Sequence, residues 1–181
     1  MTVDAHNGFG GRTGKNGAGV PVFIAIGANL GDKMANCQEA IRLMTDHPDI
    51  TLTAASKFYR TAPVDYTDQD WFVNAAVSIE TRLEPLALLD TLKSMETAMG
   101  RQRDGIRFGP RPIDLDIIFY GNLTVVTKRL EIPHPRMHKR RFVLQPICDI
   151  DPAFIHPVFH QEVRYLLDNI DDPEQAIVPL P

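Results

Sequence analysis

The chain has 181 residues, of which 44% are hydrophobic and 23% are charged, and its formal net charge is −4. These values are typical of one soluble globular domain, and the two cysteines, Cys37 and Cys148, are too few for a disulfide-rich scaffold. No apolar run is long enough to span a membrane, and no apolar segment lies near the start, so we expect a cytoplasmic protein without a membrane partner.

The first residues differ in composition from the rest of the chain. They are rich in glycine and asparagine and show no hydrophobic periodicity, which predicts a flexible leader over 1–20 before a single domain over 21–181. That domain begins with VFIAIG, an apolar run that predicts a strand over Val22–Gly27. Helical spacing of apolar residues then predicts a helix over 33–45.

Two further strands and a second helix are expected next. Apolar and β-branched residues predict a strand from Thr51 to about Arg60 and another over Phe72–Thr81. Pro85 suits the first position of a helix, and Gly100 suits the residue just past its end.

A last core strand and several additions complete the pattern. The strand is expected over Ile113–Tyr120, and it turns through Gly-Asn into LTVVT, which predicts a hairpin. Short helices are expected over 138–150 and 162–170. The order strand–helix–strand, strand–helix–strand predicts an α+β fold with a ferredoxin-like βαββαβ core, extended by the hairpin.

Two aspartates stand near the start of the last core strand, within RFGPRPIDLDIIFYG. Side chains alternate along a strand, so Asp114 and Asp116 should share one face with Ile118 and Tyr120, whereas Phe119 should lie on the other. Two carboxylates about 5 Å apart repel by roughly 3 kcal/mol at an effective dielectric near 20, so a positive group must lie beside them. Arginines in structural ion pairs could supply it, but the basic loop just before the strand favours Mg²⁺ shared with a polyphosphate.

Positive charge is concentrated around these aspartates. Residues 101–141 contain ten Lys/Arg and four Asp/Glu, whereas the rest of the chain contains nine and nineteen. This local excess favours a small polyanion over a nucleic acid, although a solvated surface is the default for any basic run. Glycines in the preceding loop would let it close over a ligand. The arginines and lysines are Arg101, Arg103, Arg107, Arg111, Arg129, Arg136, Lys139, Arg140 and Arg141, with Lys128 between the two groups.

Glu96 falls within the apolar stripe of the second helix. On a helical projection it lies between Leu89 and Leu92, on the side that also carries Leu86 and Met95. A carboxylate on the core-facing side needs a partner. A structural arginine and a ligand hydroxyl are equally good candidates.

Aromatic and polar residues elsewhere suggest a second kind of contact. Phe72 and Asn74 share a strand face, and Phe142 ends the basic segment, so two rings and an amide could hold a flat heterocycle. Phenylalanines are more often core residues. His134 fits a phosphate or ribose contact better than a zinc site, because Pro135 breaks the helical turn that such a site would need.

The segment RFGPRPIDLDII resembles the signature of the 6-hydroxymethyl-7,8-dihydropterin pyrophosphokinases of folate biosynthesis. IAIGANLGD, FYRTAPV, FVNAAV, GNLTV and RLEIPHPRMHKRRFVLQP are similar to the same family in the same order, so the resemblance extends from about Val22 to the end. It implies an α/β/α sandwich and transfer of the β,γ-diphosphate of ATP to the pterin hydroxymethyl group, with release of AMP. The sequence departs from the family at Phe72, where tyrosine is common, and at Lys93, where some members have glutamine.

The resemblance also implies roles for individual residues. Asp114 and Asp116 would hold two Mg²⁺ ions and act in catalysis together with Arg101 and Arg103, the latter from a mobile loop. The site for ATP would include Glu96, Arg101, Arg103, Arg111, Ile117, Arg129, His134 and Arg140. The pterin would contact Thr61, Val64 and Asn74 and stack between Phe72 and Phe142.

ATP and a reduced pterin are therefore the expected small-molecule partners of a monomeric enzyme that binds no nucleic acid. One alternative is another ATP- and Mg²⁺-dependent phospho- or nucleotidyltransferase on a small hydroxylated substrate, which would use the same aspartates and arginines. The other is an RNA-binding ferredoxin-like module. Such modules carry aromatic residues within their signature strands, and the sequence shows no comparable pattern.

Overall fold

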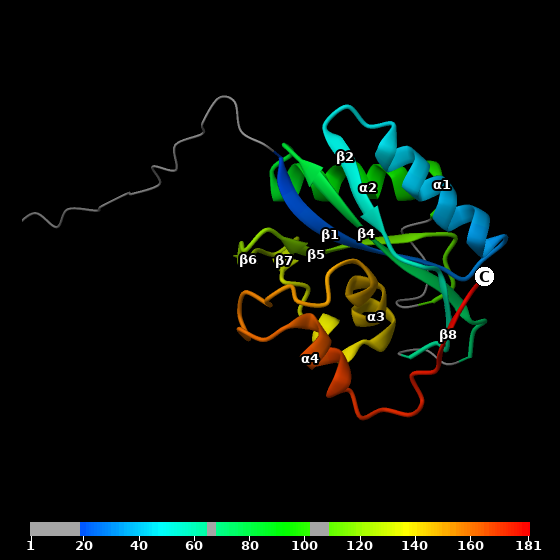
Figure 1. The fold of residues 1–181 in the computed structure, drawn as a ribbon. Coiled ribbons are helices and arrows are strands. Elements are labelled where there is room, and N and C mark those ends of the chain that lie inside the picture. Colours follow the sequence, from blue (N-terminus) through cyan, green and yellow to red (C-terminus); the bar gives the residue numbers. More distant parts are fainter. Residues whose placement is uncertain (1–18, 65–67, 102–108) are drawn as a thin grey trace, which may run out of the picture.

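The structure, a computed structural model, describes residues 19–64, 68–101 and 109–181. Its main feature is a six-stranded antiparallel sheet with the order β5–β1–β4–β3–β8, in which β2 also pairs with β4 (Figure 1). The strands of this sheet are β1 (Val20–Ala28), β2 (Ile50–Ala55), β3 (Tyr59–Thr61), β4 (Phe72–Thr81), β5 (Asp114–Tyr120) and β8 (Ile177–Pro179).

Helices cover both faces of the sheet, as Figure 1 shows. One face carries α1 (Lys33–Thr45) and α2 (Pro85–Ala98), and the other carries α3 (Arg141–Ile150) and α4 (Val163–Asp168), with a 3-10 turn, η1, over Met137–Lys139. The ferredoxin-like core and the α/β/α sandwich are thus confirmed. Among the described residues no helix is long and apolar enough to cross a membrane.

Local sequence sets the ends of the first two helices. The Asp32 carboxylate caps α1 by accepting a hydrogen bond from the backbone nitrogen of Ala35 at 3.0 Å. Pro85 occupies the first turn of α2, as predicted. Gly100 follows that helix with a φ of +88°, a left-handed conformation that glycine adopts without strain.

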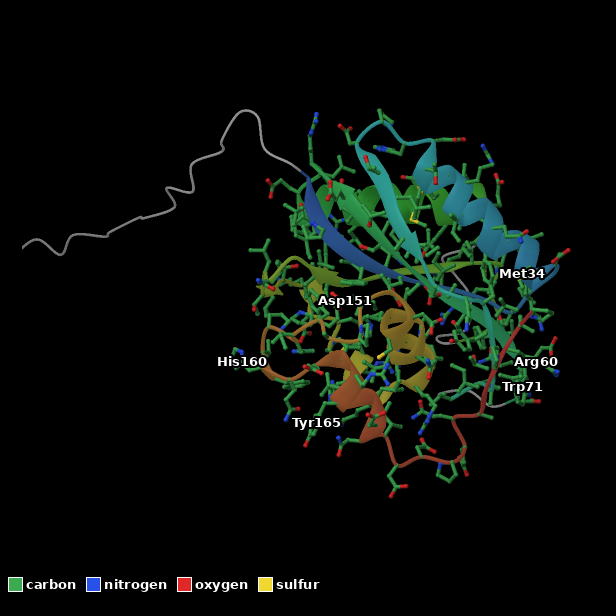
Figure 2. The ribbon with its side chains drawn as sticks, in the orientation of Figure 1. Met34, Arg60, Trp71, Asp151, His160 and Tyr165 are labelled. Carbon is green, nitrogen blue, oxygen red and sulfur yellow. The ribbon has the colours of Figure 1, made fainter. Side chains whose placement is uncertain are left out.

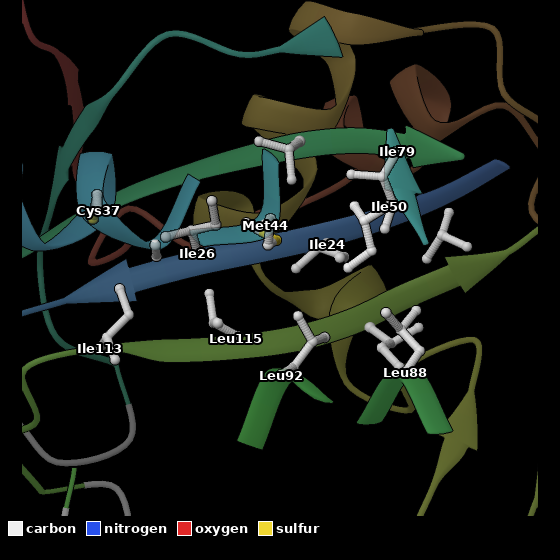
Figure 3. Close-up of a cluster of buried hydrophobic side chains, with 14 of the residues drawn as sticks. Ile24, Ile26, Cys37, Met44, Ile50, Ile79, Leu88, Leu92, Ile113 and Leu115 are labelled. Atoms are coloured by element: carbon white, nitrogen blue, oxygen red, sulfur yellow. The ribbon is translucent and has the colours of Figure 1, made fainter. Parts of the chain in front are cut away.

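Each face of the sheet has its own hydrophobic cluster. The first packs the sheet against α1 and α2, and Figure 3 shows Ile24 of β1 there with Met44 and Leu92 of the two helices. The second packs Phe23 of β1 against α3 and α4. Because β1 contributes to both clusters, its interior residues are buried on both faces, which explains the nearly continuous apolar run in its sequence.

The single strand predicted from Thr51 to Arg60 is wrong, because the structure has two shorter strands there. Both pair with β4, but they are separated at Ser56. The Ser56 nitrogen donates to the Ala76 carbonyl and its Oγ accepts from the Ala76 nitrogen, both at 2.9 Å. A side chain thus replaces a backbone partner in the ladder and ends β2. Strand β8, which covers the outer edge of β3, was not predicted.

The predicted hairpin also differs from the structure. β6 (Val125–Val126) pairs with β7 (Glu131–Ile132) in a separate two-stranded sheet and not with β5. The turn between them explains this choice, because the Thr127 nitrogen donates to the Leu130 carbonyl at 2.9 Å and the Thr127 hydroxyl accepts from the Leu130 nitrogen at 2.9 Å.

The alternation of side chains along β5 holds only for its first half. The register with β1 shifts at Phe23, and Ile118 is the extra residue of the bulge. Tyr120 therefore lies on the face of α1 and α2, where its hydroxyl donates to the Leu83 carbonyl at 2.7 Å, and Phe119 lies on the opposite face. Both were predicted on the wrong faces. Asp116 precedes the bulge and keeps its predicted face.

The leader predicted over 1–20 lies outside the described residues, apart from Gly19 and Val20. Val20 already belongs to β1, so the sheet begins earlier than expected. The loop predicted to close over a ligand also lies mostly outside the described residues, over 102–108.

His156, beside the second cluster, gives the fold a dependence on pH. Its side chain is 3% exposed, and its ring stacks on Phe159 with 4.3 Å between centroids. Its Nδ1 accepts hydrogen bonds from the Val158 and Phe159 nitrogens at 3.2 Å each, which requires a neutral acceptor there. Burial, reinforced by His138 and His160, lowers the pKa of His156 to about 4.

We expect the free energy of unfolding to fall as the pH drops from about 6.5 toward about 4, because the unfolded chain takes up a proton that the folded chain excludes. The His156 contribution is fully present above pH 6.5, and about 2 kcal/mol of it should be lost between pH 7.5 and 5. Urea denaturation at both pH values measures this loss. His156→Asn, whose amide oxygen can still accept but does not titrate, should show about 2 kcal/mol less pH dependence; equal dependence in both proteins would contradict the assignment.

Candidate active site

One pocket lies on the face of the sheet that α3 covers, with a volume of about 670 Å³ including its open mouth. Ten residues that the sequence predicted for a site line it: Thr61, Val64, Phe72, Asn74, Arg111, Asp114, Asp116, His134, Arg140 and Phe142. Eight further lining residues were not predicted: Ala25, Ile26, Gly27, Ala62, Pro63, Gln69, Ile118 and Val143.

The register of three strands forms the floor of the pocket. Gly27 of β1 stands between Asp114 of β5 and Asn74 of β4. Asp116 stands in the neighbouring row, beside Ala25. Because Gly27 and Ala25 of β1 are small, the space above them stays open, and two strand spacings put the Asp114 backbone about 10 Å from the Asn74 backbone.

Asn74 is held firmly at its end of the pocket. Its side chain is 5% exposed, and its Nδ2 donates to the Thr61 Oγ1 at 2.6 Å. A Cβ atom at Gly27 would lie only 2.6 Å from the Asn74 Oδ1, so the glycine provides room for the amide. Sequence reasoning missed Gly27 because this contact depends on the approach of a neighbouring strand.

We expect Gly27→Ala to raise the KM of a substrate bound at the Asn74 end of the pocket about tenfold or more, since the methyl group forces the Asn74 amide out of position. The KM of a substrate bound at the carboxylate end should change much less, because a Cβ at Gly27 meets only Asn74 atoms within 4 Å. Steady-state kinetics with each substrate varied in turn measures both constants. Gly121→Ala is the comparison: a Cβ there meets a Val20 side-chain atom at 3.2 Å and the φ of +49° strains it, so this variant should lower the Tm without changing either KM, because Gly121 lies outside the pocket. Equal effects on both KM values would contradict a local role for Gly27.

Two arginines neutralise Asp114. Arg101 pairs with its Oδ1, and the Arg111 Nη2 lies 3.0 Å from its Oδ2. Burial alone would raise the pKa of the Asp114 carboxyl, but Arg111 and Arg101 outweigh it and hold the pKa below its ordinary value. Asp114 is therefore ionised at neutral pH. The sequence left open whether arginines or Mg²⁺ neutralise the aspartates, and for Asp114 the structure shows ion pairs with arginines.

Asp116 has different surroundings. Its carboxylate lines the pocket and makes no ion pair with another described residue. His134 also lines the pocket, and burial lowers the pKa of its imidazole, while Asp116 opposes that shift and Arg140 reinforces it. Asp116 thus presents negative charge to the pocket that no arginine pair within the described residues cancels.

Glu96 connects α2 to the start of β5. Its side chain is 3% exposed, and its Oε1 lies 2.8 Å from the Lys93 Nζ and 2.7 Å from the Arg101 Nη1. The same oxygen accepts from the Leu115 nitrogen at 2.7 Å. Burial raises the pKa of Glu96, and Lys93 and Arg101 counteract part of that shift. The sequence left open whether Glu96 binds a structural arginine or a ligand hydroxyl, and in the structure it binds Arg101. Leu86, predicted on the same stripe, is 40% exposed.

Four sequence-predicted residues do not line the pocket. Arg101 reaches it only through Asp114, and Glu96 lies behind Arg101. Ile117 is buried in the first hydrophobic cluster. Arg129 pairs with Asp90 of α2, and both side chains are more than half exposed. Arg103 lies outside the described residues.

Asn29, which sequence reasoning did not single out, joins two segments beside the pocket. Its nitrogen donates to the Arg111 carbonyl at 3.1 Å, and its Oδ1 accepts from the Arg111 nitrogen at 2.8 Å. Its Nδ2 donates to the Gln69 Oε1 at 2.8 Å. Only the folded chain brings these segments together.

The segment around Gln69 is also fixed from the outside. The Lys33 Nζ donates to the Trp71 carbonyl at 2.7 Å, and the Arg60 guanidinium lies over the Trp71 ring, 4.7 Å from its centroid (Figure 2). The segment therefore holds a defined position beside the pocket mouth.

The donor set in the pocket fits Mg²⁺. Two carboxylates share a strand face, and hard oxygen ligands are those that Mg²⁺ prefers. Asp116 has its carboxylate directed to the pocket, whereas Asp114 would share its oxygens between arginines and a metal, which its four lone-pair sites permit. The Arg111 Nε is buried without a hydrogen-bond partner among the described residues, as expected of a group that meets a bound anion.

The chain is similar in sequence to several known proteins. A 2-amino-4-hydroxy-6-hydroxymethyldihydropteridine pyrophosphokinase of Bacillus subtilis is 42% identical over 128 residues, which cover 71% of this chain and 76% of that protein. A protein of the same name from Methylorubrum extorquens is 41% identical over 149 residues, covering 82% and 92%. A folate synthesis bifunctional protein of Arabidopsis thaliana is 49% identical over 129 residues, but the match spans only 26% of its length.

A solved structure is similar in fold. The HPPK-DHPS protein of Plasmodium falciparum superposes with a TM-score of 0.67 at 16% identity, covering 83% of this chain and 42% of that one. The model of the 7,8-dihydro-6-hydroxymethylpterin-pyrophosphokinase (HPPK) family matches residues 23–152, more than two thirds of the chain. The chain therefore belongs to the HPPK family.

Proposed function

We propose that this protein transfers the β,γ-diphosphate of ATP to the hydroxymethyl group of 6-hydroxymethyl-7,8-dihydropterin, with release of AMP. The observation that carries the proposal is the placement of paired carboxylates and a held amide at opposite ends of one pocket, in a member of the HPPK family. The Asp114–Asp116 end suits Mg²⁺ and polyphosphate, and the Asn74 end suits a flat, hydrogen-bonding ring.

The pterin end is built for recognition of a ring edge. The Asn74 amide can donate and accept, and its bond to Thr61 fixes which way it points. Phe72 and Phe142 line the same pocket, so their rings can stack on the faces of the heterocycle. Val64 lies at the mouth with 37% of its surface exposed.

In the proposed reaction the pterin hydroxyl oxygen attacks the β-phosphorus of ATP, the bond from that phosphorus to the α,β-bridging oxygen breaks, and AMP leaves. The hydroxyl proton goes to solvent, and we assign no side chain as base. Such a transfer needs positioning and charge neutralisation above all. Arg111 and Arg140 supply positive charge and donors to the phosphates, His134 supplies a ring N–H donor, and Mg²⁺ held by Asp114 and Asp116 would neutralise charge that develops during transfer.

We propose that Asp114 and Asp116 would hold two Mg²⁺ ions, and we propose roles in the ATP site for Glu96, Arg101, Arg103, Ile117 and Arg129 as the resemblance implies. We further propose a cytoplasmic monomer in which 21–181 is one domain. Light scattering should give a mass near 20.3 kDa, and a mass twice as large would refute the monomer.

A transferase acting on another hydroxylated substrate would use the same carboxylates and arginines, so only the products separate it from this proposal. Incubation with ATP, Mg²⁺ and the pterin should give AMP and a pterin with two added phosphates. Formation of ADP with a singly phosphorylated pterin would replace the proposal with an ordinary kinase.

A further inference from the structure

The C-terminal segment, residues 172–180, connects two walls of the pocket, although it lies beyond the residues that the family model matches. Figure 1 shows it (red) running from α4 to the sheet edge, where β8 pairs with β3. Ile177 is the partner of Thr61, and the Ala62 nitrogen donates to the Ala176 carbonyl at 3.1 Å. The wall that carries Thr61 and Ala62 is thus tied to this segment.

Gln175 ties the same segment to the opposite wall. Its side chain is buried, with 8% exposed. The Gln175 Oε1 accepts from the Arg141 nitrogen at 2.8 Å, and its Nε2 donates to the Lys139 carbonyl at 2.9 Å and to the Asp172 Oδ2 at 3.0 Å. The backbone partners, Lys139 and Arg141, flank Arg140 in the sequence, and Phe142 follows directly. Arg140 and Phe142 both line the pocket.

The first turn of α3 explains why this contact is needed. The cap residue of α3, Arg140, makes no capping hydrogen bond with its own side chain. The backbone nitrogen of Arg141 would otherwise lack an acceptor, since the first nitrogens of a helix have no partner within it. Gln175 supplies the acceptor from 34 residues away. Gln175 therefore both caps α3 and ties this wall of the pocket to the C-terminal segment.

We propose that Gln175 is a positioning residue that fixes the Arg140–Phe142 wall relative to Thr61 on β3 and so sets the width of the pterin end of the pocket. The inference rests on the proposed function. Loss of its bonds removes the acceptor of the Arg141 nitrogen and the donor to the Lys139 carbonyl while β8 stays paired, so the neighbouring Phe142 is held less firmly in the wall of the pterin end. Asp114 and Asp116 of β5, the proposed Mg²⁺ ligands, should keep their positions.

The test compares Gln175→Ala and Gln175→Glu with Glu174→Ala, an exposed neighbour whose side chain faces solvent. We expect Gln175→Ala to raise the pterin KM at least fivefold, with kcat at saturating pterin changed less than twofold. Gln175→Glu keeps an acceptor for Arg141 but loses the donor to Lys139 and places a second carboxylate beside Asp172, so its pterin KM should rise at least as much as that of the alanine variant. Pterin binding without turnover, followed by fluorescence at a temperature where circular dichroism shows native protein, should weaken in the same order.

Two results would overturn the inference. Pterin KM and binding equal to those of Glu174→Ala, with only the Tm lowered, would make Gln175 a purely structural residue. An equal loss in kcat for all substrates without a change in pterin KM would place its effect outside the pterin end. The wild type separates the two proposals: if it converts no pterin, the proposed function fails and the inference with it, whereas an active wild type with unchanged Gln175 variants refutes only the inference.

Discussion

Replacing Asp116 by alanine is expected to lower kcat more than about 100-fold and to change the Tm by no more than about 2 °C. Loss of residues that merely support metal ligands typically costs 10- to 100-fold, so loss of a ligand itself should cost more. The small change in Tm follows because the Asp116 carboxylate makes no ion pair with another described residue. Single-turnover kinetics and thermal denaturation measure the two quantities.

Two comparison variants sharpen this prediction. Asp46→Ala removes a carboxylate that is 60% exposed and pairs with Arg42 on the surface, and it should leave kcat unchanged. Asp114→Ala should lower both kcat and Tm, since Arg101 and Arg111 then lose their shared counter-charge. A kcat for Asp116→Ala within threefold of the wild type would rule out a metal-binding role.

Replacing Glu96 by alanine should lower the free energy of unfolding by about 3 kcal/mol, at the lower end of the cost of breaking a buried ion pair. The lower end applies because Lys93 and Arg101 keep 33% and 24% exposure and can partly turn to solvent. The Leu115 nitrogen would also lose its acceptor. Urea denaturation at pH 7 measures the change.

Glu96→Gln separates the two contributions to that loss. The amide oxygen still accepts from Leu115, so this variant should lose about half as much stability as alanine. Glu39→Ala is the surface control, because Glu39 pairs with Arg42 while both side chains are about half exposed, and it should cost less than about 1 kcal/mol. A loss in Glu96→Ala no greater than in Glu39→Ala would mean that the buried pair contributes nothing net.

Sequence reasoning succeeded where short-range rules decide the structure. The limits of α1 and α2 follow from Asp32, Pro85 and Gly100, each acting within one turn of its own helix. The shared face of Asp114 and Asp116 follows from strand alternation over three residues. Roles for individual residues came only from the resemblance to the HPPK family, and they remain predictions.

It failed where the outcome depends on how distant segments meet. The faces of Phe119 and Tyr120 depend on a bulge that only pairing with β1 reveals. Gly27 and Asn29 matter because other segments approach them, and neither has a local pattern that marks it. Gln175 belongs to the same group, since its partner is the start of a helix 34 residues earlier.

The measurement that tests the central claim most directly is the identification of products. The full chain is incubated with ATP, Mg²⁺ and 6-hydroxymethyl-7,8-dihydropterin, and nucleotides and pterins are separated by chromatography and identified by mass. AMP in equal amount to a pterin carrying two added phosphates is the predicted result. No ATP consumption that depends on the pterin, or ADP as the nucleotide product, would contradict pyrophosphoryl transfer by this pocket.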